Sequence, residues 1–553
     1  MTAAIYYHPE GYTTSGPALM GRNSAGESFL RGFLSYGKTH EYWVQVQKPE
    51  HARLFARTAQ AYGRNEPVRV VDNNSIGALA EAGAIYYPGP GIAQYAFHRA
   101  PHGHGRWSLC GITHTTSSAR AMDAIAELIT APVQPWDALI CTSSAVKNNV
   151  ERVLQAQTDY LKDRLGISKL VLPQLPVIPL GIHTQDFDFS IEQRSAARDS
   201  LQVAADTQVV LYMGRLSFHA KAHPLAMYQA LQAATLATGK TVVLVECGWH
   251  ANDSIANAFD GAARLACPNV RVVQLDGRNA EHRQIAWAGA DVLCSLSDNI
   301  QETFGIVPIE GMAARLPVVV ADWDGYRDTV REGIDGFRIP TLMPQAGLGD
   351  DLAQRHALEI DTYDVYCGHN CSLVAVDVGA TTQALIQLFE SPELRARLGE
   401  SGRQRAMSTY DWAVIIPQYE DLWAQLEEIR NAHGRDLTRL RHPWPARMDP
   451  FHAYASYATQ TLSPQTMLEL VDGDAKTALQ RTVSYRNLAM VNFAEPVLPT
   501  TDEIRELLAT FANGPRPVGE VIVQMPALRQ AFLFRSLAWL MKLNILRISL
   551  PST

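Results

Sequence analysis

Ser297-Asp-Asn-Ile-Gln-Glu-Thr-Phe-Gly-Ile-Val-Pro-Ile-Glu-Gly-Met-Ala-Ala314 is the stretch that decides the fold. It follows an apolar strand candidate that ends near Ser295 and passes through a polar loop into a helix, which we expect to begin near Thr303–Gly305. Pro308 fits only in the first turn of such a helix, where its missing N–H costs nothing. A buried strand, a short loop and a helix are the βα unit of a parallel sheet.

The start of this helix is a candidate ligand site. Its free backbone N–H groups are those of Phe304, Gly305, Ile306 and Val307. With the helix dipole behind them, these groups can bind an anion or a ring of hydroxyls. Gly305 has no side chain, so a ligand can approach the backbone closely there.

Two carboxylates flank the same helix start. Glu302 stands just before the helix, and Glu310 lies about one and a half turns inside it. Both can reach one ligand that lies across the helix N-terminus. A carboxylate accepts two hydroxyl hydrogen bonds, which suits the vicinal diols of a sugar or a ribose. Taken alone, the pair also fits two solvated helix glutamates.

Two cations follow an earlier strand candidate, Gln208–Met213. Gly214-Arg215 closes that strand, and Lys221 comes six residues after Arg215. Two cations at the mouth of a strand-to-helix turn can bind a pyrophosphate, with Arg215 as a forked donor and Lys221 as a point charge. Considered singly, either could also be a solvated basic residue.

Short apolar runs alternate with longer stretches of helical period through most of the chain, a pattern typical of βαβ units. The strand candidates before residue 172 are Ala3–Tyr7, Tyr42–Val46, Val68–Val71, Ala84–Tyr87, Ser108–Thr113 and Ala138–Thr142. After the Pro-rich passage Leu172–Gly181 they are Gln208–Met213, Thr241–Glu246, Val270–Leu275, Val292–Ser295 and Pro317–Ala321. Two βα blocks separated by a Pro-rich hinge predict two α/β domains that face one another.

The remaining segments interrupt or follow these blocks. An insert from about residue 343 to 376 has no clear period, and Trp412–Ile429 has the apolar spacing of a closing helix. After a linker, Arg441–Pro450, the tail Ala527–Ile548 fits two helices or a helix and a strand. Within it, Phe532–Leu543 predicts a core helix of a small accessory domain. An interface is the alternative, and it would allow a homo-oligomer through this region.

Composition narrows the function classes. The chain has 553 residues, too many for one hydrophobic core, and its 47% hydrophobic and 19% charged residues are ordinary for a globular protein. The net charge of −8 argues against nucleic acid or an anionic membrane as a partner. Seven scattered cysteines predict reduced thiols in a cytoplasmic protein, and we expect Cys367 and Cys371, the one close pair, to be structural. We find neither a signal peptide nor an apolar run of the roughly 18 residues that span a bilayer.

Together these residues resemble the donor half of retaining glycosyltransferase family 4, which has the GT-B fold. The resemblance rests on Arg215, Lys221 and the Glu302-x7-Glu310 pair, followed by Met312-Ala-Ala and Leu316-Pro-Val-Val. It covers roughly residues 1–430 and is strongest across 208–338. It implies an α/β protein with two Rossmann-like domains that face one another across a cleft.

The resemblance also implies domain boundaries. Residues 1–183 would form the N-terminal acceptor domain, with the closing helix 411–430 packing back on it. Residues 184–410 would form the C-terminal nucleotide-sugar donor domain. Residues 435–553 have no counterpart in the minimal family, and we expect them to form an accessory domain.

Roles for the motif residues follow from the same resemblance. Arg215 and Lys221 would neutralise the donor diphosphate, Glu310 would bind the nucleotide ribose, and Glu302 would approach the transferred sugar. The backbone amides of Phe304–Val307 would hold sugar and phosphate oxygens.

The rest of the chain supplies looser matches. Gly21, in the Gly-rich turn Gly16–Gly26, would approach the donor phosphate, and Arg278 would lie beside the base of the donor nucleotide. His114, at a strand end, matches the histidine that faces the donor sugar; a structural histidine is the alternative. Asp322–Asp328 departs from the family pattern, since it replaces the common Gly-Gly-x-x-Glu turn.

These matches predict a retaining, metal-independent hexosyltransferase. It would use a UDP or GDP sugar as co-substrate, need no cofactor, and act on a glycan, lipid-linked or protein acceptor. One alternative is a nucleotide-sugar epimerase on the same fold, which would convert the donor without an acceptor. Another is a non-catalytic GT-B scaffold whose C-terminal region binds a partner.

Overall fold

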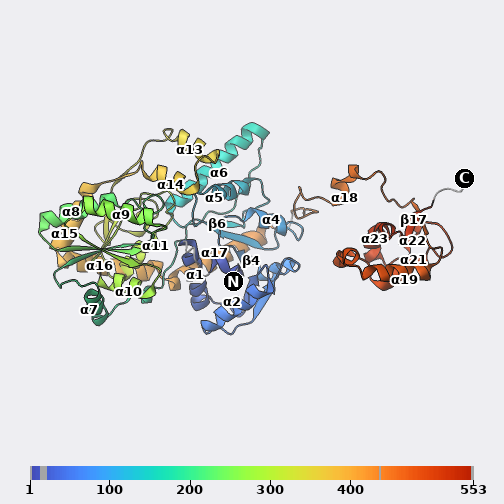
Figure 1. Ribbon diagram of the computed structural model, residues 1–553, viewed down its shortest axis with the longest axis horizontal. Coiled ribbons are helices and arrows are strands. Elements are labelled where there is room, and N and C mark those ends of the chain that lie inside the picture. Colours follow the sequence, from blue (N-terminus) through green and yellow to red (C-terminus); the bar gives the residue numbers. More distant parts are fainter. Residues whose placement is uncertain (1–2, 13–20, 435–436, 550–553) are drawn as a thin grey trace. The chain divides into compact units, whose positions relative to one another are not determined.

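The computed structural model describes residues 3–12, 21–434 and 437–549 (Figure 1). The chain divides into two compact units, Met1–Trp444 and Pro445–Thr553. The first unit contains two parallel sheets, and each sheet lies between layers of helices.

The first sheet has six parallel strands in the order β3-β2-β1-β4-β5-β6. The strands are β1 (Ala4–Tyr6), β2 (Tyr42–Gln45), β3 (Val68–Val71), β4 (Ala84–Tyr86), β5 (Ser108–Ile112) and β6 (Ala138–Ile140). The flanking helices are α1 (Gly21–Tyr36), α2 (Pro49–Ala61), α3 (Leu79–Ala82), α4 (Ala93–Arg99), α5 (Ala119–Ala126) and α6 (Ser144–Leu165). The residues of β4, β5 and β6 are all buried, as expected for parallel strands covered on both faces.

The second sheet has the order β12-β11-β10-β7-β8-β9 and is also parallel. Its strands are β7 (Gln208–Met213), β8 (Val242–Gly248), β9 (Arg271–Asp276), β10 (Val292–Ser295), β11 (Val318–Ala321) and β12 (Gly336–Ile339). Its helices are α7 (Ile191–Ser200), α8 (Leu225–Thr238), α9 (Asp253–Ala266), α10 (Ala280–Gly289), α11 (Ile306–Ala313), α12 (Tyr326–Thr329), α15 (Val378–Glu390) and α16 (Pro392–Arg405). The two six-stranded sheets confirm the expected GT-B fold class.

The chain returns to the first sheet through α17 (Trp412–His433), which packs against α1 and β5. Trp412 and Trp423 of this helix are fully buried. Gly32 of α1 makes the close approach possible, because a Cβ there would lie 2.6 Å from the Trp412 ring.

Two elements differ from the sequence expectation. The edge strand β12 was not predicted, since Gly336-Phe-Arg-Ile339 begins with glycine and includes an arginine, so it shows no apolar run. The insert that showed no clear period contains two short helices, α13 (Asp350–Ala357) and α14 (Tyr363–Cys371). The antiparallel pair β13 (Thr341–Leu342) and β14 (Ala375–Val376) closes this insert at its base.

The second unit has its own core, which lies between Leu468 and Leu546. Its helices are α18 (Pro450–Ala453), α19 (Ala475–Arg486), α20 (Ala489–Asn492), α21 (Thr501–Ala509), α22 (Val518–Val523) and α23 (Gln530–Lys542). Its antiparallel sheet contains β16 (Arg516–Pro517), β15 (Met467–Leu470) and β17 (Leu546–Ile548), in that order. The tail of the chain is thus a helix followed by a strand. Across the described ranges of both units, no helix is long and apolar enough to cross a membrane.

Candidate active site

The carboxyl ends of β7 and β10 position the candidate site. The two strands are adjacent and parallel, so the loops that follow them lie side by side. Gly214, at the end of β7, has a φ of +138° and donates its N–H to the Cys247 carbonyl at 3.0 Å. A Cβ at Gly248 would lie 1.9 Å from the Gly214 carbonyl oxygen. This tightly packed turn is thus fixed against the end of β8, the neighbour of β7 on the side away from β10.

Lys221 and Glu302 form an ion pair in this region. The Lys221 Nζ donates to the Glu302 Oε2 at 2.5 Å, and the two side chains are 24% and 11% exposed. Burial alone would raise the pKa of the Glu302 carboxyl. The charge of Lys221 and hydrogen bonds from Lys221 and the backbone of Thr303 and Phe304 outweigh burial and lower that pKa. Glu302 is therefore ionised at neutral pH.

Glu310 is the fifth residue of α11 and lies near the same cation. Burial raises the pKa of its carboxyl to about 7, against the positive charges of Arg283 and Lys221. The positive charge of Lys221 thus favours the ionised form of both glutamates. At neutral pH, Glu310 is close to half-ionised, while Glu302 carries a full charge.

Arg215 joins this group through Gln301. The Arg215 Nη2 donates to the Gln301 Oε1 at 2.9 Å and to the Ala220 carbonyl at 3.3 Å. Gln301 is the residue before Glu302. The structure therefore brings Arg215, Lys221, Glu302 and Glu310 together at one edge of the second sheet.

The start of α11 faces the same place. The helix begins at Ile306, and Gly305 is its N-cap, with a φ of +84° and no side-chain cap. The N–H groups of Ile306 and Val307 lie in the first turn, where no intrahelical acceptor is available. Phe304 is 1% exposed and belongs to the core, so only its backbone can serve a ligand. The helix begins slightly later than the sequence indicated.

The domain built on the first sheet, called the first domain below, contacts this loop from the opposite side. The Thr303 Oγ1 donates to the His114 carbonyl at 3.2 Å, and the Ser143 Oγ donates to the Thr303 carbonyl at 2.8 Å. His114 follows β5, and Ser143 caps α6, so both lie at the carboxyl edge of the first sheet. The carboxyl edges of the two sheets meet at Thr303.

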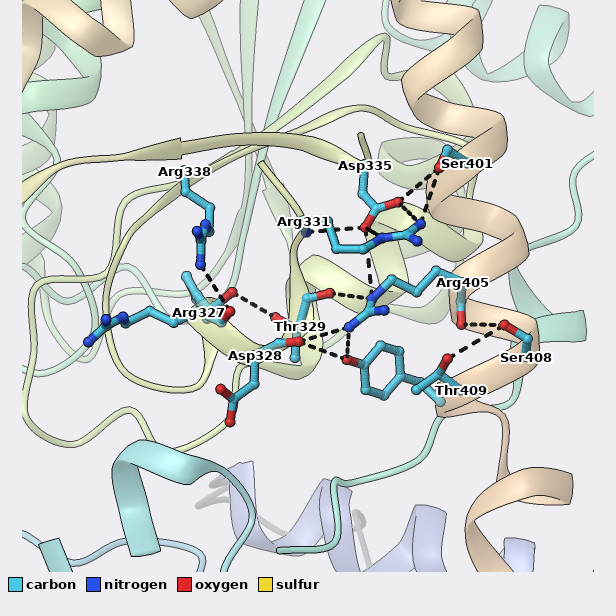
Figure 2. Close-up of polar contacts among 12 residues, drawn as sticks. Arg327, Asp328, Thr329, Arg331, Asp335, Arg338, Ser401, Arg405, Ser408 and Thr409 are labelled. Carbon is cyan, nitrogen blue, oxygen red and sulfur yellow. Dashed lines mark hydrogen bonds and ion pairs between the residues drawn. The ribbon is translucent and has the colours of Figure 1, made fainter. Parts of the chain in front are cut away.

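An ionic network around the buried Asp335 fixes the chain between α12 and β12 (Figure 2). Arg331 donates to the fully buried carboxylate of Asp335 through Nη2 at 2.6 Å and Nε at 2.8 Å. Ser401 donates to the same carboxylate at 3.0 Å, and the Arg405 Nε lies 3.8 Å from it. Asp335 thus ties α16 to this edge of the sheet.

The network also holds a contact between the two domains. Arg405 donates to the carbonyls of Thr329 at 3.0 Å and Asp328 at 2.9 Å (Figure 2). The Asp328 carboxylate accepts the Ser144 N–H at 2.6 Å, at the first turn of α6. A carboxylate at a helix N-terminus interacts favourably with the helix dipole.

The contacts that join this group in the described part of the chain do not include Arg278, and Gly21 borders a stretch that lies outside that part. Gly21 is the first residue of α1, and the turn before it, residues 13–20, lies outside the described residues. Arg278 forms a two-pronged hydrogen bond with Asp276 at the end of the edge strand β9, two strands from β7. Hydrogen bonds from Arg278 lower the pKa of Asp276 to about 2.

Three site residues escaped the sequence analysis. Gln301 lies in the quoted stretch, but only the structure pairs it with Arg215. Arg283 of α10 acts on Glu310 through its charge and belongs to no motif. Asp324 has a φ of +46° and lies in the turn Asp322–Asp328, which departs from the family pattern. That departure could have drawn attention to Asp324 in the sequence. Burial and the negative charge of Glu302 raise the pKa of Asp324 to about 8.

The cysteine pair lies beside the site. Cys367 and Cys371 are buried on α14, and the Cys371 Sγ donates to the Asp298 carboxylate at 3.1 Å. Within the part of the chain that the structure describes, no three or more His, Cys, Asp or Glu residues are grouped as metal ligands.

Comparison with known proteins relates the second domain to one family. Residues 193–346, from α7 to β13, match the model of the family described as glycosyl transferases group 1. The chain is therefore similar to this family over these residues, which include Arg215, Lys221, Glu302 and Glu310.

Individual relatives agree with this family. The chain is 31% identical to the phosphatidyl-myo-inositol mannosyltransferase of Mycobacterium leprae over 134 residues, which are 24% of this chain and 26% of that protein. It is 23% identical to the putative glycosyltransferase EpsD of Bacillus subtilis over 304 residues, 51% of this chain and 66% of that one. The chain thus spans between a quarter and two thirds of these curated relatives.

Among solved structures, the chain is similar to Anabaena Alr3699/HepE in complex with UDP. The sequences are 16% identical, the TM-score is 0.48, and the match covers 77% of this chain and 100% of that one.

Proposed function

We propose that this chain transfers a hexose from a UDP or GDP sugar to a glycan, lipid-linked or protein acceptor. The transfer retains the anomeric configuration and needs neither a metal nor a cofactor. One observation carries the proposal: Arg215, Lys221, Glu302 and Glu310 gather at the carboxyl edge of the second sheet, where the His114 carbonyl of the first domain contacts Thr303.

The cations suit the leaving group of such a reaction. Glycosyl transfer passes through an oxocarbenium-like state while negative charge grows on the leaving diphosphate. Arg215, Lys221 and the free amides at the start of α11 would stabilise that charge electrostatically. Glu310, when ionised, would accept the two hydroxyl hydrogen bonds of the nucleotide ribose.

The position of Glu302 supports a front-face route to retention. Lys221 binds one of its carboxylate oxygens, and the Thr303 N–H contacts the other at 3.3 Å. A carboxylate held on both oxygens is a poor covalent nucleophile. The acceptor oxygen would instead bond to the anomeric carbon on the face that the diphosphate leaves, and a phosphate oxygen would take the acceptor proton.

Two further features fit the proposal. The contacts of His114 and Ser143 with Thr303 bring the domains together, which would exclude water and suppress hydrolysis of the donor. All seven cysteines are buried free thiols, and these suit a reducing cytoplasmic location.

The decisive experiment combines nucleotide binding with transfer. UDP or GDP should raise the Tm of the full chain, and the matching nucleotide sugar should be consumed only with an acceptor. Lys221→Ala should lower transfer by at least about a hundredfold, because it removes a charge that neutralises the leaving group. Lys240→Ala, an exposed change at the opposite edge of the sheet, is the control. Full transfer by the Lys221→Ala variant would refute the proposal, and donor conversion without an acceptor would indicate an epimerase.

A further inference from the structure

The insert between β13 and β14 folds into a helical hairpin with its own contacts. Arg355 donates to the Asp361 carboxylate at 2.7 and 3.0 Å, and the His369 ring lies 3.1 Å from the same group. The rings of His356 and Tyr366 stack at 4.0 Å. These contacts join α13, α14 and the turn between them, so α14 is held as a defined element.

The inner face of α14 packs on the loops of the candidate site. Cys371 donates to Asp298, which lies in the loop after β10, and also to the Phe218 carbonyl at 3.4 Å in the loop after β7. Gly368 allows a close approach, because a Cβ there would lie 2.9 Å from the His219 Cβ. The insert thus lies directly against the loops that carry Lys221 and Glu302.

Tyr363, the first residue of α14, reaches both domains. Its hydroxyl accepts the Gln301 Nε2 N–H at 3.0 Å. The same hydroxyl lies 3.0 Å from the Ser117 Oγ and 3.4 Å from the Thr115 Oγ1. Thr115 and Ser117 belong to the first domain and lie one and three residues after His114 in the chain. Figure 1 shows α14 on the side of the second domain where α5 and α6 of the first domain lie.

Gln301 continues this connection to a predicted catalytic cation. Its Nε2 donates to Tyr363, and its Oε1 accepts from the Arg215 Nη2 at 2.9 Å. The amide can satisfy both partners only in one orientation, since its nitrogen donates and its oxygen accepts. The orientation of Arg215 therefore depends on Gln301, and that of Gln301 depends on the Tyr363 hydroxyl.

We propose that Tyr363 is a positioning residue that couples domain closure to the orientation of Arg215. Through Gln301 it holds the guanidinium in place, and through Ser117 it makes that hold depend on the first domain. The inference rests on the proposed function, in which Arg215 stabilises the leaving diphosphate. A dipole or charge that is fixed before the reaction stabilises a transition state better than one that must reorient.

The effect should appear in kcat more than in donor affinity. The ground-state donor would still be held by Glu310 and the α11 amides, whereas charge on the diphosphate grows only in the transition state. Tyr363→Phe removes the hydroxyl and keeps the ring, and Ser117→Ala removes the shorter of the two contacts between that hydroxyl and the first domain. We expect each change to lower kcat about tenfold, the size of one or two hydrogen bonds, with KM for the donor within about twofold.

A double-variant comparison makes this test specific. Because both changes break one connection, the Tyr363→Phe, Ser117→Ala double variant should be no slower than either single variant. Tyr366→Phe, the same chemical change one turn along α14, should retain the wild-type kcat. Unchanged kcat in Tyr363→Phe, or losses that multiply in the double variant, would overturn the proposal.

Hydrogen–deuterium exchange on the full chain tests the connection without an activity assay. Ser117→Ala lies in the first domain, yet it should speed exchange of the α14 amides severalfold, because the start of α14 loses its shorter hydrogen bond to that domain. Unchanged α14 exchange would refute the connection. If the wild type transfers no sugar, the proposed function fails, while the exchange comparison still decides whether Tyr363 joins the two domains.

Discussion

The carboxyl groups of Glu302 and Glu310 lie near the same ammonium group, yet their pKa values move in opposite directions. Glu302 receives a hydrogen bond from Lys221 as well as its charge, and its pKa is lowered. Glu310 interacts with Lys221 through charge alone, and burial raises its pKa to about 7. The protonation state of Glu310 therefore changes within the physiological pH range.

This difference predicts a pH-dependent affinity for nucleoside diphosphates. The ionised Glu310 can accept both ribose hydroxyls, whereas the protonated acid loses one acceptor. With a pKa of about 7, only about a tenth of the Glu310 carboxyls are ionised at pH 6, so affinity should fall about tenfold from pH 8 to pH 6. Calorimetric titration of UDP and GDP at the two pH values measures this change.

The Glu310→Gln variant is the matched control for this titration. It should bind more weakly at pH 8 and retain only the pH dependence that the diphosphate itself contributes. An identical pH dependence in the variant and the wild type would exclude Glu310 as the titrating group.

Sequence reasoning found the residues that lie in continuous motifs. Glu302, Glu310 and the α11 amides come from one stretch, and Arg215 and Lys221 come from another, so their spacing made them candidates and the family resemblance supplied their expected roles. Tyr363 could not be found in this way. It is 62 residues from Gln301 in sequence and lies in a segment without a helical period, and only the packing of α14 brings the two together.

Among the elements, α11 depends most directly on one residue. Gly305 precedes it with a φ of +84°, and a Cβ there would lie 1.9 Å from the Tyr326 ring. Tyr326 is fully buried and its hydroxyl bonds Ser295 at 2.9 Å, so the ring has no free space to move into. Both the backbone conformation and the packing at the start of α11 require glycine.

Gly305→Ala should therefore destabilise the protein by about 2–4 kcal/mol, from backbone strain and the clash with Tyr326. It should also weaken nucleotide binding, because the α11 amides would shift. Urea unfolding measures the first effect, and calorimetry measures the second.

Gly261→Ala in α9 is the opposite control: no atom lies within 4 Å of its Cβ position, so this change should be neutral or stabilising by up to about 1 kcal/mol. Equal stability of the two variants would contradict the role of Gly305.

The strands show which elements a sequence can predict. Val68–Val71, Gln208–Met213 and Val292–Ser295 have the predicted bounds, because each is a short apolar run that ends at a polar or glycine residue. The edge strand β12 was missed. Its pairing with β11, through the register from Gly336 opposite Val318 to Ile339 opposite Ala321, depends on the neighbouring strand and not on its own pattern.

At the scale of the whole molecule, the hydrophobic cores indicate what folds together. One core cluster runs from Ala3 to Leu426 and takes members from both six-stranded sheets, and α17 contributes Trp412 and Trp423 to it. The buried core residues of the second unit lie between Leu468 and Leu546. None of the core clusters in the described residues draws members from both units.

This separation predicts that the chain can be divided after Trp444. Residues 1–444 should unfold cooperatively, with the main transition within about 4 °C of that in the full chain, and should bind nucleotide with unchanged affinity. Trp444 stays in this fragment because its ring stacks on Phe97 at 4.7 Å. Calorimetry of both fragments and the full chain tests the prediction, and residues 445–553 should show a transition of their own.

A chain that ends at Thr409 is the control, since it loses the buried Trp412 and Trp423 and should not fold. Failure of residues 1–444 to fold would show that the second unit supports the first.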